Sequence, residues 1–133
     1  MELTSDISTI DTDTKFLSAD SMDLVFGGDL THGGEILANG SANIKVQGDI
    51  YNESSITANH TLNIVANTLK NNGNDTGASI RGGGLSSLTL NGNLDNYGLI
   101  TSSHDLDIVA HDISNYAAIA AASNLTLLST NFY

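Results

Sequence analysis

The chain has 133 residues, a length typical of one domain, and 40% of them are hydrophobic, which is enough for a packed core. It carries 4 Lys and Arg against 15 Asp and Glu, a formal net charge of −11, and it contains no Cys and no Pro. A nucleic-acid surface needs clustered Lys and Arg, and an anionic bilayer repels an acidic chain, so we expect neither as a partner. No apolar run reaches the roughly 18–20 residues of a membrane helix, so we expect no membrane insertion.

A motif of about 20 residues recurs along the chain. It reads GDIYNESSITANHTLNIVA from Gly48, GNLDNYGLITSSHDLDIVA from Gly92 and HDISNYAAIAAASNLTLLS from His111. A fixed period of this size is the signature of a solenoid, in which each repeat forms one coil and buries its apolar side against its neighbours.

Equivalent apolar residues define columns that run from coil to coil. Column one is Ile10, Leu30, Ile50, Leu69, Leu94 and Ile113. Column two is Phe16, Ile36, Ile56, Ile80, Ile100 and Ile119. A column of small residues follows two positions later, and then come alternate positions of a strand, whose middle column is Leu24, Ile44, Ile64, Leu88, Ile108 and Leu127.

The spacing of two within each strand is the β period, and apolar residues do not recur at the helical spacings of three and four. Coils stacked about 4.7–4.9 Å apart bury the columns that a single coil leaves exposed. The sequence therefore predicts an all-β fold, a parallel β-helix of six coils. We expect residues 1–133 to form one segment, with coils that start near residues 10, 30, 50, 69, 94 and 113.

One coil breaks the period. Consecutive members of column two lie 20, 20, 24, 20 and 19 residues apart, and the excess falls between Leu69 and Ile80. This predicts a five-residue insertion within residues 71–79, at a turn where it leaves the stack in register. Phe132 stands where column one of a seventh coil would begin, so we interpret the chain as a segment of a longer filament.

A polar column stands two residues after column one. Its members are Thr12, His32, Asn52, Asn71, Asn96 and Asn115. Asn accepts left-handed turn conformations and can bond its own turn, and stacked amides can also hydrogen-bond from coil to coil. We interpret the four asparagines as a structural ladder, with a ligand-binding row as the alternative.

No constellation of residues predicts catalysis or a cofactor. His60 and His104 share a column but lie two coils apart, roughly 9–10 Å, which is too far to share a zinc ion. The four basic residues, Lys15, Lys45, Lys70 and Arg81, are scattered over separate coils, whereas β-helix enzymes that act on acidic polysaccharides need basic groups. We therefore predict no enzyme, no catalytic residue, no metal and no cofactor.

Weak calcium binding remains an alternative at two places. Asp11 and Asp13, and separately Asn72, Asn74 and Asp75, have spacings that could chelate the ion. Asp29 and Asp49 would be neighbours on adjacent coils, and we interpret them as solvated surface carboxylates.

The pattern G-[DN]-[LI]-x-N-x-x-x-I-x-A-x-x-x-L-x-I, seen from Gly48 and Gly92 and less fully from Gly28, resembles the haemagglutinin repeats of the filamentous haemagglutinin family. These are large exoproteins of Gram-negative bacteria, secreted by the two-partner route, and include adhesins and contact-dependent growth inhibition proteins. The resemblance covers residues 10 to 129 and implies a right-handed parallel β-helix at the cell surface, exported through an outer-membrane partner transporter. Departures are residues 71–77, His32 in the asparagine column and Ser86 in an apolar column.

Two functions follow from this resemblance. In the first, the segment is a structural shaft that sets filament length and projects a distal functional domain. In the second, it recognises a host or bacterial cell-surface receptor or a glycan. The candidate recognition surface is the insertion and its surroundings, namely Asn72, Asn74, Asp75, Tyr97 and Tyr116. Function concentrates in irregular segments of a regular scaffold, which is why we place it there.

Overall fold

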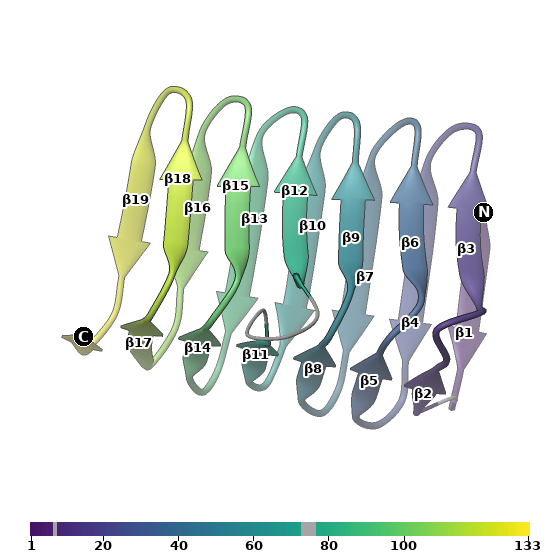
Figure 1. Cartoon of the computed structure of the whole chain (residues 1–133), viewed down its shortest axis with the longest axis horizontal. Coiled ribbons are helices and arrows are strands. Elements are labelled where there is room, and N and C mark those ends of the chain that lie inside the picture. The colour runs from purple at the N-terminus through teal and green to yellow at the C-terminus, as the bar shows by residue number, and fades with distance from the viewer. Residues whose placement is uncertain (7, 73–76) are drawn as a thin grey trace.

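The computed structural model describes residues 1–6, 8–72 and 77–133. It confirms the predicted fold class: the chain is all-β and forms a parallel β-solenoid of about 6 turns of about 20 residues. Figure 1 shows the strands ranged side by side along one axis, with the N-terminus at one end of the rod and the C-terminus at the other. The described residues include no helix that is long and apolar enough to cross a membrane.

Three parallel sheets run the length of the rod, and each coil contributes one strand to each sheet. Sheet A contains β1 (Glu2–Ser5), β4 (Met22–Phe26), β7 (Ala42–Val46), β10 (Leu62–Ala66), β13 (Ser86–Leu90), β16 (Leu106–Val109) and β19 (Leu125–Leu128). Sheet B contains β2 (Thr9–Ile10), β5 (Leu30–His32), β8 (Ile50–Asn52), β11 (Leu69–Asn71), β14 (Leu94–Asn96), β17 (Asp112–Asn115) and β20 (Asn131–Phe132). Sheet C contains β3 (Lys15–Ser18), β6 (Glu35–Ala38), β9 (Ser55–Ala58), β12 (Ser79–Gly82), β15 (Leu99–Ser102) and β18 (Ala118–Ala121).

The coil follows the order C, A, B. In Figure 1 the chain rises in front through a strand of sheet C, turns over the top, descends behind through sheet A and returns forward through the short strand of sheet B. Each new coil is displaced toward the C-terminal end, so the winding is right-handed. This is the hand that parallel crossover connections favour.

The core is the stack of inward columns. Strand pairing places Ile36, Ile56, Ile80 and Ile100 directly above one another, and each of these side chains is buried. The middle column of sheet A is also in register, from Leu24 through Ile64 to Ile108. Branched side chains of similar size, repeated at the strand spacing, pack on the equivalent residues of the coils above and below.

The predicted register is wrong in the first coil. Ile10 pairs with His32, two positions further along than the predicted partner Leu30. The corner between β2 and β3 takes four residues, 11–14, where the next coil uses two, Gly33 and Gly34. Ile10 therefore occupies the position of the polar column, and Thr12 lies exposed in the corner. An isoleucine satisfies either inward position, so its apolar character could not distinguish the two registers.

Two strands lie outside the predicted coils. β1 precedes the first coil and pairs with β4, which places Leu3 beside Leu24. At the other end, β20 places Phe132 beside Ile113, the position expected for column one of a further coil.

The departure at Ser86 has a local explanation. Ser86 is buried, and its hydroxyl donates to the carbonyl oxygen of Gly84 at 3.2 Å. A Cβ atom added to Gly82 would collide with this hydroxyl, so glycine in the column of small residues makes room for serine in the apolar column.

The insertion lies at the corner between sheets B and C. β11 ends at Asn71 and β12 begins at Ser79, so seven residues fill a corner for which the preceding coil uses two, Glu53 and Ser54. β12 nevertheless pairs in register with both β9 and β15. Gly77, at the end of the insertion, has a φ of 68°, a left-handed conformation that glycine adopts without a Cβ clash.

Candidate functional site

The four asparagines of the polar column form a continuous chain of side-chain hydrogen bonds. The Nδ2 of Asn52 donates to Oδ1 of Asn71 at 2.8 Å, Asn71 donates to Asn96 at 2.9 Å, and Asn96 donates to Asn115 at 2.9 Å. Asn52, Asn71 and Asn96 are fully buried. Each bond joins two consecutive coils, so the ladder connects the coils inside the rod, along the corner between sheets B and C.

Asn52, Asn96 and Asn115 also hydrogen-bond the turn that follows each of them. In the fifth coil the Asn96 Oδ1 accepts the backbone N–H of Gly98 at 3.2 Å, while its Nδ2 donates to the Gly98 carbonyl at 3.0 Å. Asn52 makes the same pair of contacts with Ser54. None of these asparagines uses a left-handed conformation, since no non-glycine residue in the described part of the chain has a positive φ. The amides are selected for bonding capacity rather than for backbone conformation.

His32 occupies the asparagine position in the second coil but does not complete the ladder. Its Nε2 lies 2.9 Å from the carbonyl oxygen of Ser55 in the next coil. Its Nδ1 is buried and is the one buried side-chain polar atom in the described residues with no hydrogen-bond partner. Burial lowers the pKa of the His32 imidazole from its ordinary value of 6.5, against a smaller opposite effect of the Ser55 carbonyl.

Three residues of the predicted recognition surface, Asn72, Tyr97 and Tyr116, form one group with Tyr51 and Lys70 of sheet B. The rings of Tyr97 and Tyr116 are stacked, with centroids 4.6 Å apart and an interplanar angle of 12°. The Nζ of Lys70 lies 5.4 Å from the centroid of the Tyr97 ring and 5.4 Å from that of Tyr51. Asn72 donates from Nδ2 to the Tyr51 hydroxyl at 2.9 Å. We call these five residues the tyrosine–lysine row.

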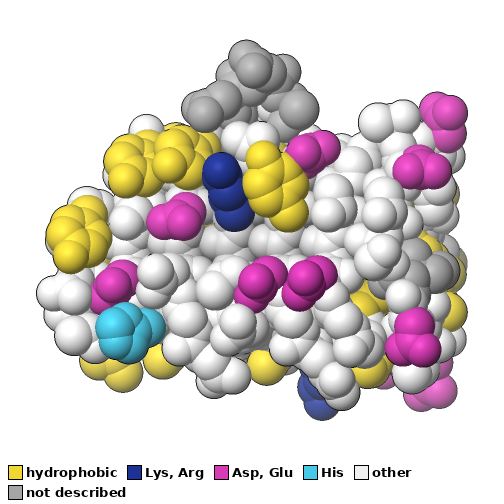
Figure 2. Space-filling model, turned by 90° about the horizontal axis from the view of Figure 1, so that it is seen from below, with side chains coloured by type: hydrophobic (Ala, Val, Ile, Leu, Met, Phe, Trp, Pro, Cys, Tyr) yellow, Lys and Arg dark blue, Asp and Glu magenta, His cyan; other side chains and the backbone are white. Residues whose placement is uncertain are grey.

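The row lies beside the insertion and on an otherwise acidic face. Seen from below, the molecule shows a basic side chain between hydrophobic ones, with several separate carboxylates on the remaining face (Figure 2). A shallow groove adjoins the row and is lined by residues that include Asp29, Asp49, Tyr51, Lys70 and Asp95. Tyr116 is 64% exposed, whereas Lys70, Tyr51 and Tyr97 are half-buried.

Some members of the predicted surface are therefore together, and others are not described. Asn72, Tyr97 and Tyr116 belong to the row, while Asn74 and Asp75 lie outside the described residues. Sequence reasoning treated Lys70 as one of four scattered cations and so missed its place in the row. The repeat contained the signal, because Tyr51 and Lys70 stand at the same position of adjacent coils.

The surface carboxylates accept hydrogen bonds from neighbouring coils. Asp49 donates its backbone N–H to Oδ1 of Asp29 at 2.8 Å and accepts from the Asn67 side chain at 2.9 Å. The side-chain hydrogen bond from Thr68 and then that from Asn67 lower the pKa of the Asp49 carboxyl from 3.8, against a partial desolvation. No group of three or more His, Asp or Glu among the described residues is placed to hold a metal ion, and Asn74 and Asp75 fall outside that statement.

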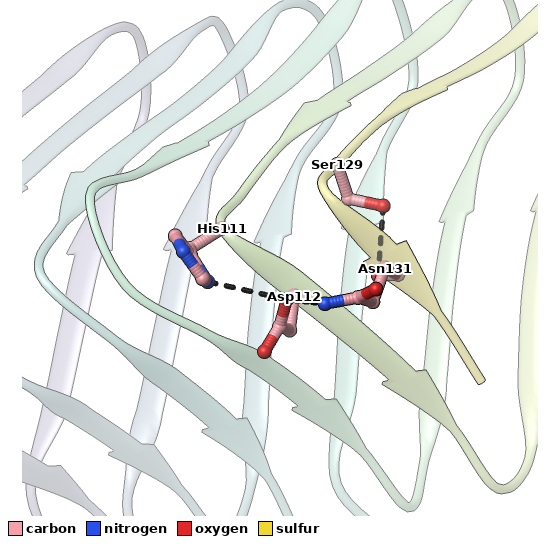
Figure 3. Close-up of polar contacts among 4 residues, drawn as sticks. All are labelled: His111, Asp112, Ser129 and Asn131. Atoms are coloured by element: carbon pink, nitrogen blue, oxygen red, sulfur yellow. Dashed lines mark hydrogen bonds and ion pairs between the residues drawn. The ribbon is translucent and has the colours of Figure 1, made fainter.

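A serine, a histidine and an aspartate meet near the C-terminal end, but they are not connected as a catalytic triad. His111 Nδ1 lies 3.1 Å from Oδ1 of Asp112, and the same carboxylate oxygen accepts from Asn131 Nδ2 at 2.9 Å. The Ser129 hydroxyl donates to the Asn131 carbonyl at 2.9 Å, away from the imidazole (Figure 3). A triad needs the serine hydrogen-bonded to the histidine. The cluster instead ties β20 to β17.

Comparison of the chain with protein-family models, with curated proteins and with solved structures finds no match.

Proposed function

We propose that this chain is a structural shaft segment of a bacterial cell-surface filament, exported by an outer-membrane partner transporter and carrying a distal functional domain away from the cell. The observation that supports it most directly is the buried asparagine ladder, which joins four consecutive coils in a single direction. Its bonds repeat at the coil spacing and hold each coil to the next, so the unit can be repeated without limit along the axis. The resemblance to filamentous haemagglutinin repeats gives the cellular setting.

A shaft sets the length of the filament and does not itself bind the target. Adding or removing whole coils tests this. Removal of residues 94–112 joins Asn93 to Ile113, which keeps the period, because Leu94 and Ile113 are register partners. In the full-length exoprotein, each coil removed or duplicated should change filament length by about 4.8 Å. Duplicating this coil several times, with length measured by electron microscopy, should leave target-cell binding unchanged.

The tyrosine–lysine row favours a second function, recognition of a cell-surface receptor or a glycan. Aromatic rings with polar ends are enriched at recognition surfaces, because they supply contact area at a low cost in conformational entropy. Here three tyrosines and a lysine lie on consecutive coils beside the corner that contains the insertion.

The two functions make opposite predictions for changes in the row. Lys70→Gln with Tyr116→Ala removes the cation of the row and its most exposed ring, and Lys45→Gln on the outer face of sheet A is the control. If the segment recognises a target, the row variant should lose cell binding at unchanged filament length, while the control binds normally. Deletion of residues 72–76 shortens the corner to the two residues of its neighbours and should give the same loss. Unchanged binding in both variants would leave the shaft as the whole function.

A further inference from the structure

His32 is a buried titratable group for which a shaft has no need. It is 0% exposed, it stands where the next four coils carry asparagine, and one of its two ring nitrogens has no partner. A buried polar atom without a hydrogen bond loses its water partners and gains nothing in return, so it lowers the stability of the rod at this position. An asparagine would avoid the cost, as the rest of the column demonstrates.

The hydrogen bonds define the protonation state of the ring. The Ser55 carbonyl can only accept, so the proton of the neutral imidazole is on Nε2 and Nδ1 carries a lone pair. A second proton would have to go on Nδ1, where it would create a buried N–H and a buried positive charge with no acceptor. The partner on the N-terminal side of His32 is Ile10, which offers only a hydrocarbon side chain.

The surface next to this position is acidic. A depression beside Ile10 and Gly33, the register partner and the chain neighbour of His32, contains the side chains of Asp11, Asp13 and Glu53. The charged or titratable side chains on the elements around His32 are Asp11 and Asp13 of the β2–β3 corner, Lys15 on β3, Glu35 on β6, Tyr51 on β8 and Glu53 of the β8–β9 corner. Lys15 and Glu35 are paired at 3.4 Å, which leaves three carboxylates at the depression. An imidazolium that turned outward would find counter-charges there.

We infer that His32 is a proton-sensitive joint: on mild acidification its ring leaves the core for the acidic depression, and the first coil opens from a rod that otherwise stays folded. The coils joined by the asparagine ladder should not open in this way, because amide side chains do not take up a proton on mild acidification. The opening would loosen the β2–β5 contact and leave the coils from β8 onward in place.

The pH range follows from the direction of the pKa change. The folded pKa of His32 lies below the ordinary value of 6.5, so the opened state binds the proton more tightly than the closed state. The ratio of closed to opened coil has its full value above about pH 6.5. It falls as the pH drops toward the lowered folded pKa, by at most tenfold per pH unit. Asp49, whose lowered pKa lies below 3.8, responds only in a more acidic range.

Amide hydrogen exchange measures the joint directly, with rates corrected for the intrinsic pH dependence of exchange. Three backbone amides donate to carbonyls of the first coil: Thr31 to Ser8 at 2.7 Å, Gly33 to Ile10 at 2.7 Å and Glu35 to Thr14 at 3.0 Å. Between about pH 7.5 and 5 their protection should fall by about tenfold or more. Tyr97, whose N–H donates to Asn71, should keep its protection.

Two variants separate the joint from general acid sensitivity. His32→Asn restores an amide at the column position, so the three amides should keep their protection over the same pH range. His60→Asn replaces an exposed histidine and should behave like the unaltered chain. The proposal is overturned if the three amides of the unaltered chain hold their protection to pH 5, or if His32→Asn loses protection equally. A nitrogen NMR titration that shows His32 protonating at or above pH 6.5 in an intact fold would also overturn it.

Discussion

The asparagine ladder predicts that replacing one asparagine by aspartate lowers stability by an amount that depends on the position of that residue in the ladder. Asn71 sits in the middle: it accepts from Asn52 at 2.8 Å and donates to Asn96 at 2.9 Å and to the Leu99 carbonyl at 3.2 Å. Asn71→Asp keeps the size and shape of the side chain but replaces the donor by an acceptor. An ionised carboxylate would then face two acceptor oxygens in a buried position.

The size of the stability loss follows from the need to protonate the new carboxyl group. Only a protonated carboxyl can donate to Asn96. Keeping it protonated at pH 7, about three pH units above the ordinary aspartate pKa of 3.9, costs 1.36 kcal/mol per pH unit, or about 4 kcal/mol. The lost bond to Leu99 adds about 1 kcal/mol. The total is a large part of the 5–15 kcal/mol that stabilises a typical domain. Because the folded pKa is raised, the cost is small below about pH 4 and grows as the pH rises.

Asn115→Asp is the matched control. Asn115 is half-buried, accepts from Asn96 at 2.9 Å and donates only weakly, to Ala117 at 3.4 Å. An aspartate can still accept there, so we expect a loss of about 1 kcal/mol or less with little pH dependence. Urea unfolding followed by circular dichroism, with each variant compared with the unaltered chain at the same pH, measures both. Equal losses for the two variants, or a loss at Asn71 that does not grow with pH, would refute the ladder as the source of stability.

Two further outcomes follow from the geometry. The Asp49 carboxyl should titrate below 3.8 in carbon NMR, and Asn67→Ala should move its midpoint upward, because one of the hydrogen bonds that hold the charged form is removed. The stability that Asp49 contributes is present above pH 3.8 and is lost as the pH falls through its folded pKa. Gly83→Ala should destabilise the rod by about 1–3 kcal/mol, because the new Cβ would collide with the backbone oxygen of Asn59. Gly28→Ala, where nothing lies within 4 Å, should change stability by about 0.5 kcal/mol or less in a thermal melt.

The fold was predictable because the same pattern of inward apolar residues occurs in several successive coils. The column of Ile36, Ile56, Ile80 and Ile100 recurs at spacings of 20, 24 and 20 residues, and the strand pairing reproduces it residue by residue. The first coil was predicted two residues out of register, since Ile10 fits either of two inward positions. β1 was missed, because a single short strand has no complete copy of the repeat with which to be compared.

The candidate site was only partly predictable, for a physical reason. Position in the repeat shows which residues are neighbours, but it does not show how a long side chain lies on the surface. Lys70 could therefore be placed next to Tyr51, whereas its contact with the Tyr97 ring depends on the direction of its flexible chain. For the same reason the unpartnered nitrogen of His32 could not be predicted, since it depends on the orientation of a ring inside the corner.

The side-chain ladders run in opposite directions inside and outside the rod, and this explains where aspartate is allowed. The buried ladder donates from each coil to the next, and backbone groups such as those of Gly98 fix that direction. The exposed pairs donate to the preceding coil, as in Asn43 to Asp23, Asn67 to Asp49, Asn124 to Asp105 and Asn131 to Asp112. A carboxylate can only accept, so it fits at the N-terminal end of an exposed ladder, where these four aspartates stand.

The acidic surface is therefore in part a set of acceptors that join consecutive coils, and the charge of −11 is not only a solubilising layer. The inner ladder has the reverse requirement. At its N-terminal end the Asn52 oxygen keeps the N–H of Ser54 as a partner when the preceding residue has no amide to donate. A residue without an amide can stand there without breaking a hydrogen bond between two asparagines, and this is the position of His32. A histidine at Asn71 would break two rungs, so the one place where the column can carry a titratable ring is the end at which the first coil joins the rod.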